Sequence, residues 1–430
     1  MDTFITNVTA VTMTPGAEVL FGVNIGITDG KIEFISKKVP EEMPKTIIEG
    51  TGMVAMPGLI NCHTHLATSV LRCFTDDLTN KEALEALLQK EAKMDSRSAK
   101  AAALLSIAEC LRFGVTSVSD LYYYPNATAQ AVAESGIKAN LALSSYRYID
   151  QNEEFDFETD EQCRELQKVV DKWHGYDNGR IKIDAGIFAE YTSNYPLWES
   201  LAGYASEKGL GMQLHLSETR NEVDSCLDRT GMTPGELLAC HRLFAVPATA
   251  SGCAFLESEE AKMLGKKKVS AVALPLSAAK NGQPCAPITD LVKAGMNVAL
   301  GTDGAIQAGN LDMFEVMRGA AMSVRASKGD PSALPSSAAL MMATVCGAQA
   351  QGRSKECGML QAGIDADIVL VDLREEQVVQ PDALLSRSDF SIFQGKRLRG
   401  WPVATIKGGH IAAWEGKLTG DSQRGRILKH

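Results

Sequence analysis

Hydrophobic and polar positions follow two different periods along this chain. Near its beginning and its end the period is two, as at 4–8, 23–27, 32–35, 366–372 and 403–411. A period of two is typical of strands with one buried face. Short strands at both ends gain most of their stability when they share a core. We therefore expect residues 1–56 and 361–430 to pair into one small, composite β-sandwich domain.

The middle of the chain, residues 57–360, alternates short apolar runs with amphipathic segments. Residues 98–113 have helical spacing that stops at Gly114, and 115–120 read as the following strand. Further strands are expected at 182–186, 211–215, 269–273 and 298–301. Repeated strand–helix units over this length predict an α/β fold, a (β/α)8 TIM barrel, rather than a doubly wound sheet.

The composition and net charge of the chain argue against some classes of binding partner. The 430 residues carry 43 basic and 53 acidic side chains, a net charge of −10, which argues against nucleic acid or an anionic membrane as partner. No signal peptide and no run of membrane-spanning length is expected. The ten cysteines form no CxxC pair, which suits reduced thiols. We expect a cytoplasmic protein that acts on a small molecule.

The candidate chemistry lies at the ends of the predicted strands. His63 and His65 share one face of a strand, His215 ends a middle strand, and Asp303 follows a late one. A barrel gathers such ends in one pocket, where this set could hold one divalent cation. Zinc is favoured, and iron or manganese also fits the ligand types. Glu218, three residues after His215, could transfer a proton.

Each of these residues also has a structural interpretation. A single histidine at a strand end is usually a hydrogen-bonded structural residue, Asp303 could cap a helix or form an Asx turn, and Glu218 could sit at a solvated helix start. Their coincidence at strand ends favours the metal site. Arg147 could hold a substrate carboxylate, or it could be an ordinary surface arginine.

Three motifs, at 57–65, 215–219 and 300–304, resemble the metal-site motifs of the amidohydrolase superfamily. The nearest branch holds 5-methylthioadenosine/S-adenosylhomocysteine deaminases and triazine chlorohydrolases. Shorter matches lie at 27–32, 76–78, 310–315 and 366–369. The resemblance implies that His63, His65, His215 and Asp303 are metal ligands and that Glu218 and Asp303 are catalytic. It also implies that Glu91 contacts substrate and that the protein is a homodimer or a higher homo-oligomer.

The chain departs from that family pattern in its pocket. Gly252 stands where the family has a histidine that orients and deprotonates water, and Phe188 replaces a substrate-facing histidine. The family's His-Asn-Pro-x-Ser is Ala-Leu-Pro-Leu-Ser at 273–277, and an aromatic residue expected near 82–84 is missing. His241 could replace the lost base, or it could be a structural histidine at a helix end.

Two functions remain open. The first is a metal-dependent hydrolase that acts on C–N bonds of a small, purine-like or other heterocyclic substrate through a metal-activated water. The second is a metal-binding paralogue, catalytically impaired, that binds a small ligand or a partner. An enzyme that loses its general base reacts about 10²–10⁴ times more slowly. Because Gly252 stands in place of the family's histidine, a hydrolase of this kind is expected to have reduced activity.

Overall fold

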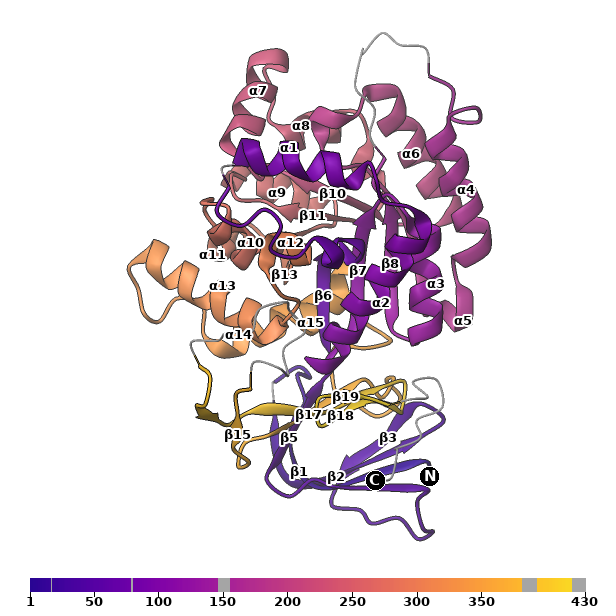
Figure 1. Cartoon of the computed structure of the whole chain (residues 1–430), viewed down its shortest axis with the longest axis vertical. Helices are drawn as coiled ribbons and strands as arrows, with labels where there is room; N and C mark the ends of the chain where they lie inside the picture. Colours follow the sequence, from indigo (N-terminus) through magenta and orange to yellow (C-terminus); the bar gives the residue numbers. More distant parts are fainter. Residues whose placement is uncertain (17, 79, 146–154, 381–392, 420–430) are drawn as a thin grey trace. The chain divides into compact units, whose positions relative to one another are not determined.

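A computed structural model describes the chain except for residues 17, 79, 146–154, 381–392 and 420–430, and the side chains at 80, 81, 84 and 88 (Figure 1). Two compact units are present. One consists of residues 1–60, 107–116 and 353–430, and the other of residues 61–106 and 117–352. The predicted domain limits, 1–56 with 361–430 and 57–360, remain a proposal.

The first unit contains a nine-stranded sheet built from both ends of the chain. Its strands follow the order β19-β18-β17-β14-β5-β1-β2-β3, with β4 paired to β1. They are β1 (Thr3–Val11), β2 (Val19–Thr28), β3 (Lys31–Ser36), β4 (Thr46–Glu49), β5 (Met53–Pro57), β14 (Ile368–Asp372), β17 (Trp401–Lys407), β18 (His410–Trp414) and β19 (Lys417–Leu418). β15 (Gln377–Val378) and β16 (Arg397–Leu398) form a separate pair.

The period of two explains how this sheet buries one set of side chains. Ile5, Ile25, Ile27, Ile368 and Ile406 come from four strands, have no exposed surface and lie in one hydrophobic cluster. β14 pairs antiparallel with β5, which joins the end of the chain to its beginning. The predicted sharing of a core between the two ends is confirmed.

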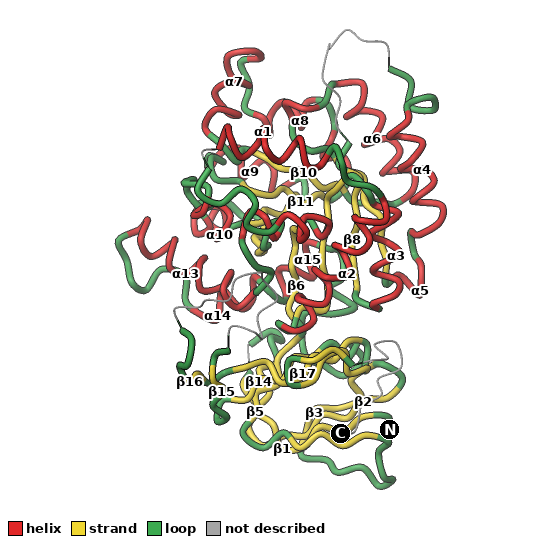
Figure 2. Tube along the Cα trace, viewed as in Figure 1, coloured by secondary structure: helices red, strands yellow, loops and turns green. Residues whose placement is uncertain are grey.

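The second architectural element is a sheet of eight parallel strands in the order β13-β12-β11-β10-β9-β8-β7-β6. Figure 2 shows strands of this sheet in yellow, among them β6, β8, β10 and β11. The backbone N–H of Asp303, beyond β13, donates to the carbonyl of His63 in β6 at 3.0 Å, so the two edges of the sheet meet. The strands are β6 (Leu59–Thr64), β7 (Val115–Tyr122), β8 (Lys138–Leu143), β9 (Ile181–Gly186), β10 (Met212–Leu216), β11 (Ala248–Gly252), β12 (Val269–Ala273) and β13 (Asn297–Leu300).

Helices connect these strands, as a (β/α)8 barrel requires. The predicted helix at 98–113 spans Ser96–Arg112, and the chain leaves it through Gly114 at φ +80°. The α-helices are α1 (Asn80–Glu91), α2 (Ser96–Arg112), α3 (Pro125–Ser135), α4 (Glu161–Trp173), α5 (Tyr176–Gly179), α6 (Tyr195–Lys208), α7 (Arg220–Thr230), α8 (Pro234–Cys240), α9 (Ser258–Lys266), α10 (Pro275–Lys280), α11 (Ile288–Lys293), α12 (Ala305–Ala308), α13 (Met313–Lys328), α14 (Ser336–Met342) and α15 (Val345–Ala350). Short 3-10 turns span Leu66–Leu71, Glu190–Thr192 and Leu243–Ala245.

The barrel and the separate sheet made from the two termini confirm the predicted fold class. Strands of the barrel are buried on both faces: every residue of β6, β7, β8 and β10 is buried. Because both faces are covered, polar residues of these strands, such as Asn140 and Gln213, are buried as well. Within the described part of the chain, no helix combines the length and the apolar character needed to cross a membrane.

Candidate metal centre and active site

Three histidines converge where strands β6 and β10 end. His63 lies in β6, His65 directly follows that strand, and His215 lies in β10. One ligand nitrogen from each ring can be chosen so that all three lie within 4.8 Å of one another. All three side chains are buried. His63 and His65 were predicted to share one face of a strand, and His215 was predicted to lie at the end of another strand. The three histidines form one cluster.

Backbone carbonyls fix the orientation of two of these rings. His65 Nδ1 lies 2.7 Å from the carbonyl oxygen of Leu121, and His215 Nδ1 lies 2.9 Å from that of Phe188. An Nδ1–H that donates to a carbonyl leaves Nε2 as the lone-pair nitrogen, which is the usual arrangement of a metal-ligating histidine. Nε2 of His63 is buried without a hydrogen-bond partner. Since buried polar atoms are almost always paired, this nitrogen fits a metal ligand.

Asp303 adds a carboxylate to the cluster. Its Oδ1 lies 3.2 Å from His65 Nε2 and 3.8 Å from His63 Nε2, and its Oδ2 accepts a 2.6 Å hydrogen bond from Ser277. Burial alone would raise the pKa of Asp303, but hydrogen bonds from His65 and Ser277 and the nearby histidine charges hold it well below its ordinary value. The carboxylate is therefore ionised and available to a cation.

The histidines respond differently to this environment. Burial lowers the pKa of His63, and burial together with the charge of His65 lowers that of His215 to about 4. For His65 the hydrogen bond and charge of Asp303 outweigh burial and raise its pKa to about 9. Neutral His63 and His215 already have the protonation state of ligands, and His65 must lose a proton to become one.

Glu218 follows β10 in the loop that leads into α7. Burial, with the charges of Asp303 and Glu222, raises the pKa of its carboxyl to about 8. A carboxyl group that holds its proton near neutral pH can act as an acid and then as a base. The electrostatics of the loop therefore suit the proton-transfer role predicted for Glu218.

Gly252 ends β11 and is opposite Leu216 of β10. A Cβ atom at this position would lie 2.9 Å from Glu218 Cβ, so the two residues are adjacent. His241 belongs to a different environment: its ring stacks on Tyr195 with centroids 4.0 Å apart, and its Nδ1 lies 3.0 Å from a Glu199 carboxylate oxygen. These contacts to α6 are those of a structural histidine, which was the second interpretation of the two.

Two of the predicted substrate residues lie beside the histidines. The Phe188 ring is 4.7 Å from the His215 ring, centroid to centroid. Glu91, at the end of α1, accepts a 2.5 Å hydrogen bond from the Tyr122 hydroxyl, and the Tyr122 ring lies 5.9 Å from that of His65. Arg147, the third predicted residue, lies outside the described residues.

Sequence reasoning did not assign roles to three residues that support the site. Ser277 hydrogen-bonds Asp303, Tyr122 hydrogen-bonds Glu91, and Asp120 accepts the backbone N–H of Leu66 at 2.6 Å. Ser277 matches the serine of the family pattern His-Asn-Pro-x-Ser, and this match was the one available signal in the sequence. The other two contacts depend on how separate strands and loops meet in space.

Comparisons with known proteins agree with this geometry. Residues 54–412 match the pattern described as "Amidohydrolase family". A 5-methylthioadenosine/S-adenosylhomocysteine deaminase of Moorella thermoacetica is 36% identical over 338 residues, covering 78% of this chain and 77% of that protein. A 5'-deoxyadenosine deaminase of Methanosarcina acetivorans is 35% identical over 375 residues, covering 87% and 85%.

Two solved structures have the same fold as this chain. An adenosine deaminase of Xanthomonas campestris with bound zinc superposes with a TM-score of 0.85 at 26% identity, over 97% of this chain and 94% of that one. Atrazine chlorohydrolase TrzN of Arthrobacter aurescens, at 22% identity and a TM-score of 0.84, covers 97% and 96% and shares the fold. The match over residues 54–412 and the deaminases that are 35–36% identical show that the chain belongs to the amidohydrolase family.

Proposed function

We propose that this amidohydrolase is a zinc-dependent enzyme that hydrolytically deaminates a small amino-heterocycle. His63, His65, His215 and Asp303 would hold the ion. One observation carries the proposal: ligand nitrogens of the three histidines lie within 4.8 Å of one another. His63 Nε2, buried without a hydrogen-bond partner, supports it. Imidazole nitrogens and a carboxylate oxygen are the donor types that zinc prefers, and iron or manganese would accept the same set.

A divalent ion in this site supplies a Lewis acid and lowers the pKa of water from about 15.7 towards 7. The protein's own residues carry the protons. Glu218 holds a proton on its carboxyl at neutral pH and can give it to a ring nitrogen of the substrate. Its carboxylate can then take up a proton that the attacking water releases and pass it to the departing amine, and the second proton of the water restores the acid. Asp303 stays ionised, and the Phe188 ring beside His215 covers one side of the cluster with an apolar surface.

The relatives suggest the class of substrate. Those at 33–36% identity are named 5-methylthioadenosine/S-adenosylhomocysteine deaminases or 5'-deoxyadenosine deaminases. We therefore place the substrate among purine nucleosides with a modified 5' position and related amino-heterocycles. Because Gly252 supplies no base, S-adenosylhomocysteine itself should be turned over weakly. The protein would act in the cytoplasm on this small molecule as a homodimer or a higher homo-oligomer.

Ammonia release tests the proposal. Metal analysis of the purified protein is followed by assays on 5'-methylthioadenosine, S-adenosylhomocysteine, 5'-deoxyadenosine, adenosine, guanine and a pterin, each with and without a chelator. The expected result is deamination of at least one of these, abolished by chelation and by His215→Ala, with S-adenosylhomocysteine a poor substrate. Turnover that survives chelation would contradict the proposal, and rapid turnover of S-adenosylhomocysteine would contradict the assignment of Gly252.

Gly252 also motivates a second candidate, a metal-binding paralogue without catalysis. That protein would contain stoichiometric metal and would be stabilised by a heterocyclic ligand in thermal unfolding. It would release no product from amines, amides or halides in the same assays. The two candidates therefore differ in one measured quantity, the amount of product formed.

A further inference from the structure

The backbone of residues 217–219, which carries Glu218, is held by one buried carboxylate. Glu222 Oε1 accepts the N–H of Ser217 at 2.8 Å, and Oε2 accepts those of Glu218 at 2.8 Å and Thr219 at 3.4 Å. Thr219 completes a capping box, since its hydroxyl accepts the N–H of Glu222 at 3.2 Å. Three neighbouring backbone donors therefore converge on a single side chain.

This loop is held in a conformation that is unfavourable by itself. Ser217 has φ +48°, in the left-handed region that residues other than glycine rarely adopt. Such conformations persist where the surroundings over-determine them. On the other side, the N–H groups of Cys253 and Phe255 donate to the carbonyls of Leu216 and Ser217, both at 2.9 Å. The loop is thus tied to the start of α7 and to the residues that follow β11.

Gly252 leaves room for the side chain of Glu218. A Cβ atom at position 252 would lie 2.9 Å from Glu218 Cβ, a distance that real Cβ atoms essentially never show, and 3.0 Å from Glu218 Cγ. Gly252 has φ +88°, which also disfavours any other residue. A side chain at position 252 and the present position of Glu218 are therefore incompatible.

We infer that Glu222 and Gly252 are positioning residues that together fix the carboxyl group of Glu218 at the metal centre. Glu222 fixes the backbone of residues 217–219 through hydrogen bonds, and Gly252 leaves the space into which Glu218 Cβ and Cγ pack. Gly252 is then a requirement of this chain's proton path through Glu218, and restoring a histidine there displaces the acid. The inference rests on the proposed function for the role of Glu218, but the geometry can be tested separately.

Glu222→Gln tests the backbone clamp. Its amide offers one acceptor oxygen, and its NH2 group faces an N–H donor, so at least one of the three donors loses its partner. Since a displacement of about 1 Å can cost about 10²-fold, kcat should fall about 10- to 100-fold, with KM changed less than about threefold and metal content unchanged.

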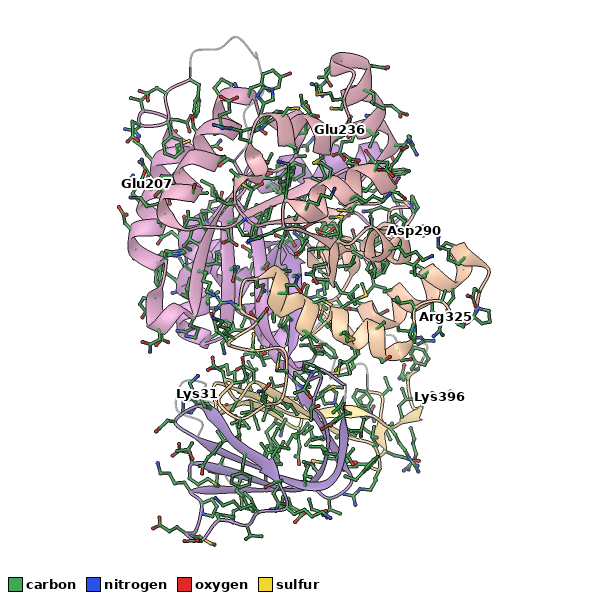
Figure 3. The ribbon with its side chains drawn as sticks, turned by 180° about the vertical axis from the view of Figure 1, so that it is seen from behind. Lys31, Glu207, Glu236, Asp290, Arg325 and Lys396 are labelled. Atoms are coloured by element: carbon green, nitrogen blue, oxygen red, sulfur yellow. The ribbon has the colours of Figure 1, made fainter. Side chains whose placement is uncertain are left out.

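The matched control is Glu236→Gln. Glu236, labelled in Figure 3, occupies the equivalent capping-box position at the start of α8, where it accepts the N–H of Thr233 at 3.0 Å. It lies on the surface, and its carboxylate and backbone N–H both hydrogen-bond Thr233 of its own capping box. Its variant should keep the wild-type kcat. Equal losses in both variants would overturn the inference, because a generic loss of helix capping would then explain them.

Gly252→Ala tests the space beside Glu218, and Gly231→Ala is its control. Gly231 has φ +71° and would place a Cβ with nothing within 4 Å, so it shares the backbone strain without the contact. We expect kcat to fall about 10- to 100-fold in Gly252→Ala only. Gly252→His should also lose activity, and a gain in kcat would overturn the inference.

Crystal structures of Glu222→Gln, Gly252→Ala and the two controls give a readout besides activity. A shift of the Glu218 carboxyl by about 1 Å or more in the first two, and not in the controls, supports the inference. An unmoved Glu218 overturns it. If the wild-type protein deaminates none of the compounds in the ammonia assay, the proposed function fails, and these structures still decide whether Glu222 and Gly252 position Glu218.

Discussion

Nε2 of His65 lies 3.2 Å from Oδ1 of Asp303. Burial lowers the pKa of this histidine, but the hydrogen bond and charge of Asp303 raise it to about 9. In the metal-free protein this pair stabilises the fold fully below the ordinary histidine pKa of about 6.5. That contribution is lost as the pH rises through 9, when His65 becomes neutral.

The same proton makes metal binding depend on pH. A metal ligand must be neutral imidazole, so binding at pH 7 should release about one proton from His65, and apparent affinity should rise about tenfold per pH unit up to about 9. Isothermal titration calorimetry of zinc in buffers of different ionisation enthalpy measures the release. Zinc binding at pH 7 without proton release would show that His65 is not a ligand or is already neutral.

Removing a ligand should remove the metal and its stabilisation. Wild-type protein is expected to contain about one ion per chain, and a free metal concentration 1,000 times Kd stabilises the folded state by about 4 kcal/mol. His215→Ala should contain little metal, and its thermal unfolding should not change on addition of a chelator. His410→Ala is the control, because His410 lies at the start of β18, outside the cluster. A chelator-sensitive His215→Ala protein would contradict the assignment.

The sequence predicted the part of this centre that depends on local pattern. His63 and His65 share a face because strand side chains alternate. His215 ends one predicted strand of the barrel, and Asp303 follows another. The fold class followed from the same rhythm of strands and helices. The fold class is confirmed, and the four side chains lie close together because a barrel gathers the ends of its strands. Their role as metal ligands stays a prediction.

The remaining features depend on distances between segments that are far apart in the chain. That Ser277 reaches Asp303, or that Tyr122 reaches Glu91, is set by how loops from different strands meet. For His241, the position in the sequence suggested a role that its contacts in space do not support. Its place just before a strand made it a candidate for the missing base, and its actual partners, Tyr195 and Glu199, come from another helix.

Glu218→Gln separates metal binding from chemistry. Glutamine has nearly the shape of glutamate but cannot hold or deliver the proton, so kcat should fall by about 10²–10⁴. The substitution leaves His63, His65, His215 and Asp303 in place, and metal content should therefore stay at the wild-type value. Stopped assays with the best substrate of the ammonia screen, together with metal analysis, measure both. A variant with normal kcat would remove Glu218 from the proton path.

The last prediction concerns how the substrate is held. The Tyr122 hydroxyl donates to Glu91, whose pKa is raised by burial. If Glu91 accepts sugar hydroxyls, Glu91→Gln loses hydrogen bonds to a charged group, worth about 1.5–3 kcal/mol, and KM for a nucleoside should rise about 10- to 100-fold while kcat changes little.

Compounds without a sugar provide the control for Glu91. The KM of a free amino-heterocycle should be the same in the wild type and in Glu91→Gln, because no hydroxyl meets the carboxylate. Tyr122→Phe should raise KM for the nucleoside by a smaller factor, since Glu91 keeps its charge but loses the donor that orients it. An equal rise in KM for both kinds of compound would mean that Glu91 shapes the pocket and does not bind the sugar.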